Sequence, residues 1–164
     1  MSDGEERSMT SAGDIKARPS RARYDQVKKT LDLKWRRRAL QAERMTREIV
    51  DGLWDAFGDS PWTWCGFWLL QPDGKACQPG PGRPDPAAGP APVEGALAEA
   101  IASGLAKPGA TTIFAPAFDK NGRVWAVFEA RASAPFDDMD ARWIERLFKA
   151  FQTIEKPLIA PPER

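Results

Sequence analysis

Residues 111–133 read TTIFAPAFDKNGRVWAVFEARAS, and this stretch decides the fold that we expect for the chain. Its two apolar runs, 113–118 and 124–128, are rich in the β-branched and aromatic side chains that favour strands. Between them, residues 119–122, DKNG, supply the positive φ angles that a tight hairpin loop requires. The stretch therefore predicts a β-hairpin.

Apolar side chains occupy both faces of the second predicted strand. In a regular strand Val124, Ala126 and Phe128 point to one face, and Trp125 and Val127 point to the other. We therefore expect the hairpin to be covered on both sides, as a central pair of strands is. Pro116 in the first strand lacks the N–H group that a paired position needs, so we expect it at a bulge or on a side without a partner strand.

The composition bounds the chemistry that the chain can perform. Its 164 residues suffice for one domain with a buried core, and its net charge of +1 excludes a bulk polyelectrolyte. The sequence contains no histidine, which removes Ser-His-Asp chemistry, His-ligated zinc or haem, and the usual proton shuttle near neutral pH. Two cysteines alone cannot form a four-cysteine zinc site, so we expect neither a metal nor a cofactor.

The chain is expected to be one cytoplasmic domain with a tail at each end. No stretch has the apolar core of a signal peptide or the roughly eighteen apolar residues of a membrane span. Residues 1–20 are polar and lack periodicity, which predicts a disordered tail before a single domain at 21–156. Pro157 ends the last predicted helix, so residues 157–164 are predicted to be a loose tail.

Residues 24–57 predict one long helix, because apolar side chains recur three and four positions apart. The stripe consists of Val27, Leu31, Trp35, Ala39, Ala42, Met45, Ile49, Leu53 and Phe57. The polar side of its first half is strongly basic, as in the run 34–38, KWRRR. Such a charge asymmetry can steer a protein onto nucleic acid, an anionic surface or an acidic partner. A solvated helix face explains it equally, and we favour that reading because no nucleic-acid motif accompanies the run.

Residues 62–70, WTWCGFWLL, predict a strand with an unusual share of aromatic side chains. Two interpretations stay open. The aromatic side chains are ordinary core, or one face with Trp62, Trp64 and Trp68 lines a ligand pocket while Phe67 and Leu69 pack against the helices.

The second half of the chain predicts a loop and two helices. Residues 78–92, QPGPGRPDPAAGPAP, predict a stiff extended loop that crosses a sheet face. A short helix is expected at 93–103, ended by Gly104. The last helix is expected to start at Asp137, with Asp140 favourable to the helix dipole. Its apolar stripe consists of Met139, Trp143, Leu147, Phe148, Phe151 and Ile154.

The two terminal helices have wide apolar faces to bury. One sheet face can take both, or part of each can pair with a second subunit. We expect a homodimer, and we expect the dimer or partner interface to contain Trp35, Trp143, Leu147 and Phe151.

Four short motifs in this order resemble the GAF fold, in particular the branch that contains the free methionine-R-sulfoxide reductases. They are 64–69, WCGFWL, similar to W-x-G-F-Y-L; 113–116, IFAP, similar to I-V-V-P; 119–127, DKNGRVWAV, similar to D-x-x-G-x-x-I-A-V; and 136–140, FDDMD, similar to F-D-x-x-D. The resemblance covers about residues 26–156. It implies an α+β, PAS-like fold with a central antiparallel sheet flanked by N- and C-terminal helices.

The catalytic cysteines of the reductases that this chain resembles have no counterpart here. The family carries them on the loop before the short helix, on that helix and on a loop ahead of the I-V-V-P strand. The resemblance places Leu97 at the helix cysteine, and the loop with the attacking cysteine is missing between Leu105 and Thr111. Cys65 and Cys77 match no family thiol. The resemblance therefore implies a protein that is not an enzyme.

The family's pocket residues can be carried over to this sequence. They fall on the ligand-binding candidates Trp64, Trp68, Thr112, Glu129 and Arg131. Threonine and arginine replace acidic residues that would hold the ammonium of a free amino acid, which disfavours a methionine-like ligand. One alternative is an anionic or flat aromatic ligand over the tryptophans, held by the arginine. The other is a filled pocket with the glutamate and arginine exposed at a strand end.

A disulfide between the two cysteines is not expected. The turn at 72–74 places Cys77 opposite about Leu70, which leaves Cys65 roughly 16 Å away along the strand, beyond bridging distance.

We therefore expect a non-catalytic GAF-like signalling module, regulatory or adaptor in role, that binds a partner protein, a small ligand or both. Two alternatives stay open: binding of nucleic acid or an anionic surface through the basic helix, and a residual thiol-dependent methionine sulfoxide reductase that uses Cys65 or Cys77.

Overall fold

The structure, a computed structural model, describes residues 19–36, 41–58 and 61–153. Both predicted tails, 1–20 and 157–164, lie outside these ranges except for Pro19 and Ser20. The strands are β1 (Trp62–Leu70), β2 (Ala76–Arg83), β3 (Ala91–Pro92), β4 (Lys107–Pro108), β5 (Thr112–Phe118) and β6 (Val124–Ala132). The helices are α3 (Ser20–Trp35), α4 (Ala42–Phe57), α5 (Gly95–Ser103) and α6 (Asp138–Phe148), followed by the 3-10 helix η1 (Lys149–Thr153).

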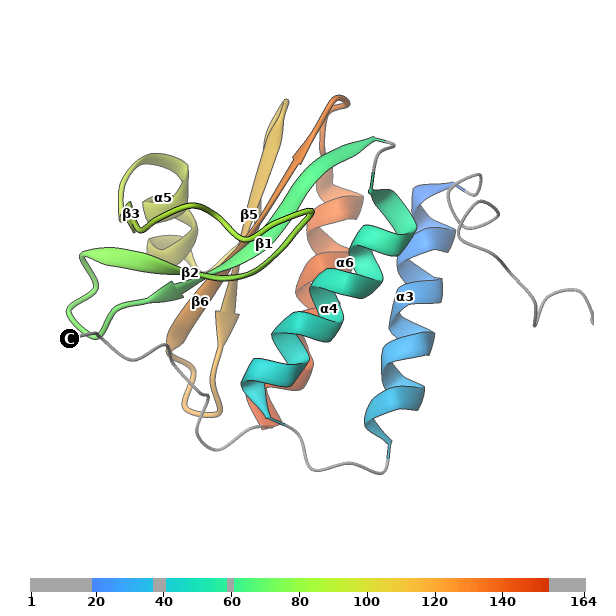
Figure 1. The fold of residues 1–164 in the computed structure, drawn as a ribbon, viewed down its shortest axis with the longest axis horizontal. Helices are drawn as coiled ribbons and strands as arrows, with labels where there is room; N and C mark the ends of the chain where they lie inside the picture. The colour runs from blue at the N-terminus through green and yellow to red at the C-terminus, as the bar shows by residue number, and fades with distance from the viewer. Residues whose placement is uncertain (1–18, 37–40, 59–60, 154–164) are drawn as a thin grey trace, which may run out of the picture.

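The strands form one antiparallel sheet in the order β3-β2-β1-β6-β5-β4. Figure 1 shows α3, α4 and α6 on one face of this sheet and α5 on the other. Apolar side chains accordingly form two clusters, a large one under α3, α4 and α6 and a smaller one that includes Leu97 of α5. The prediction of an α+β fold with a central antiparallel sheet and flanking helices is confirmed.

The predicted hairpin is formed by β5 and β6. Its loop has Gly122 at a φ of 79°, and the Asp119 carboxylate accepts hydrogen bonds from the N–H groups of Asn121 and Arg123. Strand β6 pairs with β1 on its other side, so it is central as expected. β4 pairs with β5 only at Ile113 and Phe114, which leaves Pro116 without a partner on its outer side within the described sheet.

Two β-bulges turn tryptophans toward the helices, against the sequence prediction. On β1 the partners are Trp62↔Ala132 and Trp64↔Arg131, so two residues of β1 oppose one of β6. Trp62 thereby leaves the face of Trp64 and is 2% exposed, with its ring stacked 4.6 Å from Phe57. The predicted common face of Trp62, Trp64 and Trp68 is therefore wrong for Trp62.

A second bulge alters the start of β6. The partners Ala117↔Ala126 and Phe118↔Val124 leave Trp125 as the extra residue. Its ring packs edge-on against Phe151 at 5.1 Å in the large cluster, while Val124 packs on the smaller one. The predicted orientation of these two side chains is therefore reversed.

The long helix predicted at 24–57 is in fact two helices. Helix α3 ends at Trp35 and α4 begins at Ala42, and Figure 1 shows them side by side and antiparallel. A single helix of that length would extend about 50 Å, well past a sheet of this size. Folding back instead places the stripes of both halves on one core, and the Trp35 indole N–H donates to Glu48 of α4 at 2.6 Å.

The loop predicted at 78–92 is partly strand. β2 extends to Arg83 and pairs with β1, and β3 pairs with β2 only at Ala76 and Cys77. Beyond Cys77 the outer edge of β2 has no partner in the described sheet, so Pro79 can lie in the strand without removing a hydrogen bond from the ladder.

A buried hydrogen bond connects α3 to the start of α6. Asp137 caps α6 as predicted, in a capping box with Asp140. The Tyr24 hydroxyl donates to Asp140 Oδ1 at 2.8 Å, and both side chains are buried. Burial raises the pKa of Asp140, while the hydrogen bonds from the Asp137 backbone and from Tyr24 act in the opposite direction.

We expect Tyr24→Phe to destabilise the fold by about 1–3 kcal/mol, because it leaves a buried carboxylate oxygen without its donor. Urea unfolding checks this, with Thr63→Val as a control that removes an exposed hydroxyl bonded to the Arg131 carbonyl. Equal midpoints for the two variants would contradict the expectation.

Candidate functional site

The five ligand-binding candidates lie on the sheet face opposite α4 and α6. Thr112 of β5 is the register partner of Arg131 of β6, which is the partner of Trp64 of β1. Residues directly opposite in a sheet share a face. Trp68 and Glu129 lie further along the same face, where the Trp68 ring is 6.4 Å from the Trp64 ring. We call Trp64, Trp68, Glu129 and Arg131, which contact one another, the sheet-face cluster.

Glu129 is the centre of the sheet-face cluster. Its Oε1 accepts from the Trp68 indole N–H at 3.0 Å, and its Oε2 accepts from Arg131 Nε at 2.9 Å. Glu129 is only 5% exposed, so the prediction that this carboxylate is exposed at a strand end is wrong. A buried carboxylate needs such donors, because an unpaired one loses its hydration without compensation.

Arg131 closes the cluster on its outer side. Its guanidinium carbon lies 4.6 Å from the centre of the Trp64 ring, a cation–π contact, while its side chain stays 49% exposed. Arg131 is thus the exposed member of the cluster, as predicted for this residue.

Two glycines make room for the Trp64 ring on the sheet. A Cβ at Gly66 would lie 2.7 Å from the Trp64 indole, and one at Gly82 would lie 3.2 Å from it. The indole N–H donates to the Asp85 carbonyl at 2.8 Å. Neither glycine is among the predicted site residues, although Gly66, which stands between bulky side chains of β1, is a signal of close approach.

The sheet-face cluster is therefore a compact set of side chains that satisfy one another. It offers a half-exposed guanidinium and a half-buried indole for recognition. It holds no hydroxyl or thiol nucleophile among its members. Its chemistry suits binding.

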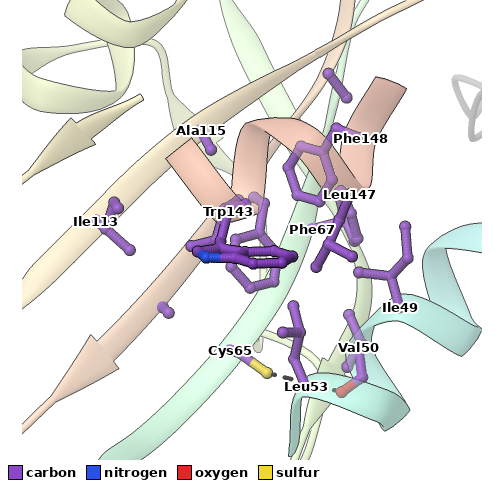
Figure 2. Packing of buried hydrophobic residues seen from close by; sticks show 14 of the residues in the cluster. Ile49, Val50, Leu53, Cys65, Phe67, Ile113, Ala115, Trp143, Leu147 and Phe148 are labelled. Atoms are coloured by element: carbon purple, nitrogen blue, oxygen red, sulfur yellow. Dashed lines mark hydrogen bonds between the residues drawn. The ribbon is translucent and has the colours of Figure 1, made fainter. Parts of the chain in front are cut away.

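The two thiols lie on opposite faces of the sheet, and both are buried. Cys65 packs among the helices, with Sγ 4.0 Å from the Val50 carbonyl, as Figure 2 shows. Burial raises the pKa of Cys65 far above its usual range and that of Cys77 to about 11. Cys77 pairs with Leu70 in the register that the sequence predicts, and the structure contains no disulfide between the two residues.

We expect neither thiol to react with a disulfide reagent in the folded protein, because both are buried and protonated at neutral pH. Thiol titration should return none in native buffer and two after denaturation without reductant. A rapidly reacting thiol in native buffer, or none after denaturation, would contradict the structure.

Three of the predicted interface residues are core residues instead. Trp143, Leu147 and Phe151 are buried within the chain, with Phe151 at 0% exposure. The Trp143 ring is stacked 6.3 Å from the Tyr24 ring of α3, and Figure 2 draws Trp143 and Leu147 among the buried hydrophobic residues of the core. Trp35 is half-buried against the same core. The prediction that Trp143, Leu147 and Phe151 form a dimer interface is wrong, because folding α3 back lets one sheet face bury both terminal helices.

Neighbouring acids neutralise part of the basic side of the N-terminal helices. Ion pairs one helical turn apart join Lys28 to Asp32 at 2.8 Å and Lys29 to Asp25 at 3.1 Å. The break between α3 and α4 also divides the basic run, and Arg37 and Arg38 lie outside the described residues. Ion pairs of this kind are typical of a solvated helix face, and binding of nucleic acid or an anionic surface stays a prediction.

The described ranges contain no group of three or more Cys, Asp or Glu side chains placed to hold a metal ion. Nor do they contain a helix long and apolar enough to cross a bilayer.

Solved structures share this fold. No protein-family model and no curated protein matches the chain. The free methionine-R-sulfoxide reductase of Neisseria meningitidis, in complex with its substrate, has a TM-score of 0.70 and 21% identity over 84% of this chain and 90% of that one. The reduced reductase of Staphylococcus aureus has a TM-score of 0.68 and 19% identity over 79% and 93%. A structure of a GAF domain has a TM-score of 0.68 and 15% identity over 88% and 96%.

These similarities show that the chain has the GAF fold, as its motifs predict. The neighbours include enzymes and a GAF domain, so the fold is compatible with both kinds of function.

We expect Arg131→Ala to destabilise the fold by about 1–2 kcal/mol, because buried Glu129 loses its charged donor. Arg123→Ala, which removes an exposed arginine of the β5–β6 loop, should change stability by less than about 0.5 kcal/mol. Chemical denaturation of both variants is the measurement. Similar stability losses would mean that the Arg131–Glu129 contact contributes little.

Proposed function

We propose that this chain is a non-catalytic regulatory module with the GAF fold, an adaptor that binds a partner protein, a small ligand or both. The observation that carries this proposal is the placement of its two thiols, which are buried on opposite faces of the sheet. The alternative, a residual reductase, has to use one of them.

Thiol-dependent reduction of a sulfoxide requires a thiolate that attacks sulfur and a second thiol that resolves the intermediate. Cys65 faces the helical core, where burial disfavours the thiolate. Cys77 lies under α5 against Leu97, the residue that stands where the resemblance places a cysteine. Both thiols are buried, and the sheet separates one from the other.

The sheet-face cluster supports binding without turnover, and it also limits the ligand. A free amino acid needs acidic groups for its ammonium. Here Arg131 already supplies a cation, which pairs with Glu129 and covers Trp64. A second cation would have to displace this tethered one, at a cost in desolvation and repulsion. A carboxylate or phosphate on a flat ring suits the exposed edge of Arg131 better.

Two other expectations have a weaker basis. Homodimerisation stays a prediction, and it would have to use side chains other than Trp143, Leu147 and Phe151, which the core already buries. Nucleic-acid binding through the basic helix loses support because the ion pairs of Lys28 and Lys29 neutralise part of that face.

We expect no reduction of free methionine-R-sulfoxide in the presence of dithiothreitol or a thioredoxin system. Methionine formation measured by chromatography tests this, with a known reductase as the positive control. Turnover that disappears in Cys65→Ser or Cys77→Ser would overturn the non-catalytic proposal.

A further inference from the structure

Two neighbouring hollows lie along the seam between α3 and α6 on the helical side of the molecule, and we call them together the α3–α6 groove. One part of it is lined by Arg21, Ala22 and Trp143, and the next by Leu31, Trp35 and Lys149. Arg146 lines both parts, so they adjoin. The groove runs along α3, whose sixteen residues correspond to about 24 Å at helical rise, enough for four turns of a docked helix.

The floor of this groove is apolar. Ala22, Trp35 and Ala150 are half-buried, so part of their surface faces the groove. Arg146 lies over the Trp143 ring at 4.2 Å, which fixes its guanidinium at the middle of the groove. An arginine held in place on an aromatic ring loses less freedom when it binds a carboxylate.

The rim has unbalanced positive charge. Asp25 and Asp32 are paired with lysines of α3. Arg21, Arg146 and Lys149 are exposed and, in the described part of the chain, have no carboxylate partner. These three cations therefore remain available to an acidic ligand.

The same features argue against other occupants. A second copy of the chain, docked by a two-fold axis through this groove, would bring the three cations of each copy near those of the other. The phosphates of a nucleic-acid backbone would gain nothing from an apolar floor. An acidic segment with an apolar side matches both the rim and the floor.

We propose that the α3–α6 groove binds an acidic amphipathic segment of a partner protein. Apolar side chains of this segment contact the half-buried surfaces of Ala22, Trp35 and Ala150, and its carboxylates meet Arg21, Arg146 and Lys149. The proposal names the partner class for the adaptor function proposed above, and it does not depend on the sheet-face cluster, which lies on the other side of the sheet.

The test uses a fluorescein-labelled sixteen-residue peptide that carries Leu on one helical face and Glu on the other, and it measures fluorescence anisotropy with the full chain. We expect saturable binding that weakens as salt is added. A peptide with Gln in place of Glu, and one with the same composition in scrambled order, should each bind about tenfold more weakly or worse.

Charge reversal on the protein locates the site. Arg21→Glu combined with Lys149→Glu should weaken peptide binding by about tenfold or more. Arg142→Glu, which reverses one exposed charge on α6 at a residue that does not line the groove, should stay within about twofold of the wild type. Circular dichroism confirms that the variants are folded, since both reversed residues are exposed.

The proposal is overturned if the peptide does not bind, or if the Glu and Gln peptides bind equally well. It is also overturned if Arg142→Glu weakens peptide binding as much as the double variant does. Two further contrary results are tighter binding of a single-stranded oligonucleotide than of the peptide, and a wild-type dimer that the double variant dissociates. The Arg131→Ala variant should bind the peptide as the wild type does, because Arg131 lies on the other side of the sheet. A negative result for peptide binding at the α3–α6 groove is therefore distinguishable from a negative result for ligand binding at the sheet-face cluster.

Discussion

The register of β1 on β6 is the constraint on which the rest of the structure depends. It places Phe67 opposite Phe128 on the helical side, where their rings meet edge-on at 5.3 Å and form the middle of the core. The same register brings Trp64 beside Arg131 on the other side. A slip by one residue would reverse every side chain of the pair, sending Glu129 into the helical core and Phe128 to the opposite face. Core and candidate site are thus set by one pairing.

The sequence is informative where local chemistry determines structure. The DKNG loop, the Asp137 cap and the order of four motifs predict the hairpin, the start of α6 and the GAF fold, because turns, caps and alternating strands depend on near neighbours. All five candidate site residues share one sheet face for the same reason, since they come from regular parts of three paired strands.

The errors come from features that depend on the tertiary structure. The bulges at Trp62 and Trp125 add one residue to an alternating pattern, and no residue type in those strands marks them. The break between α3 and α4 is equally hidden, because the apolar stripe continues across it without glycine or proline. Once α3 folds back, Trp143, Leu147 and Phe151 are covered by the chain itself, so they are not available as a dimer interface. The pairing of Arg131 with buried Glu129 could be guessed from their spacing, but the burial of the carboxylate could not.

The proposed function depends on the claim that Arg131, paired with Glu129, leaves no place for a ligand ammonium on this face of the GAF fold. Side-chain indole resonances of Trp64 and Trp68, followed by NMR during titration with free methionine-R-sulfoxide, test this claim most directly. The account predicts that neither resonance shifts in the wild-type protein. A saturable shift of the Trp68 indole N–H, whose partner is Glu129, would show that the substrate reaches the carboxylate and would contradict it.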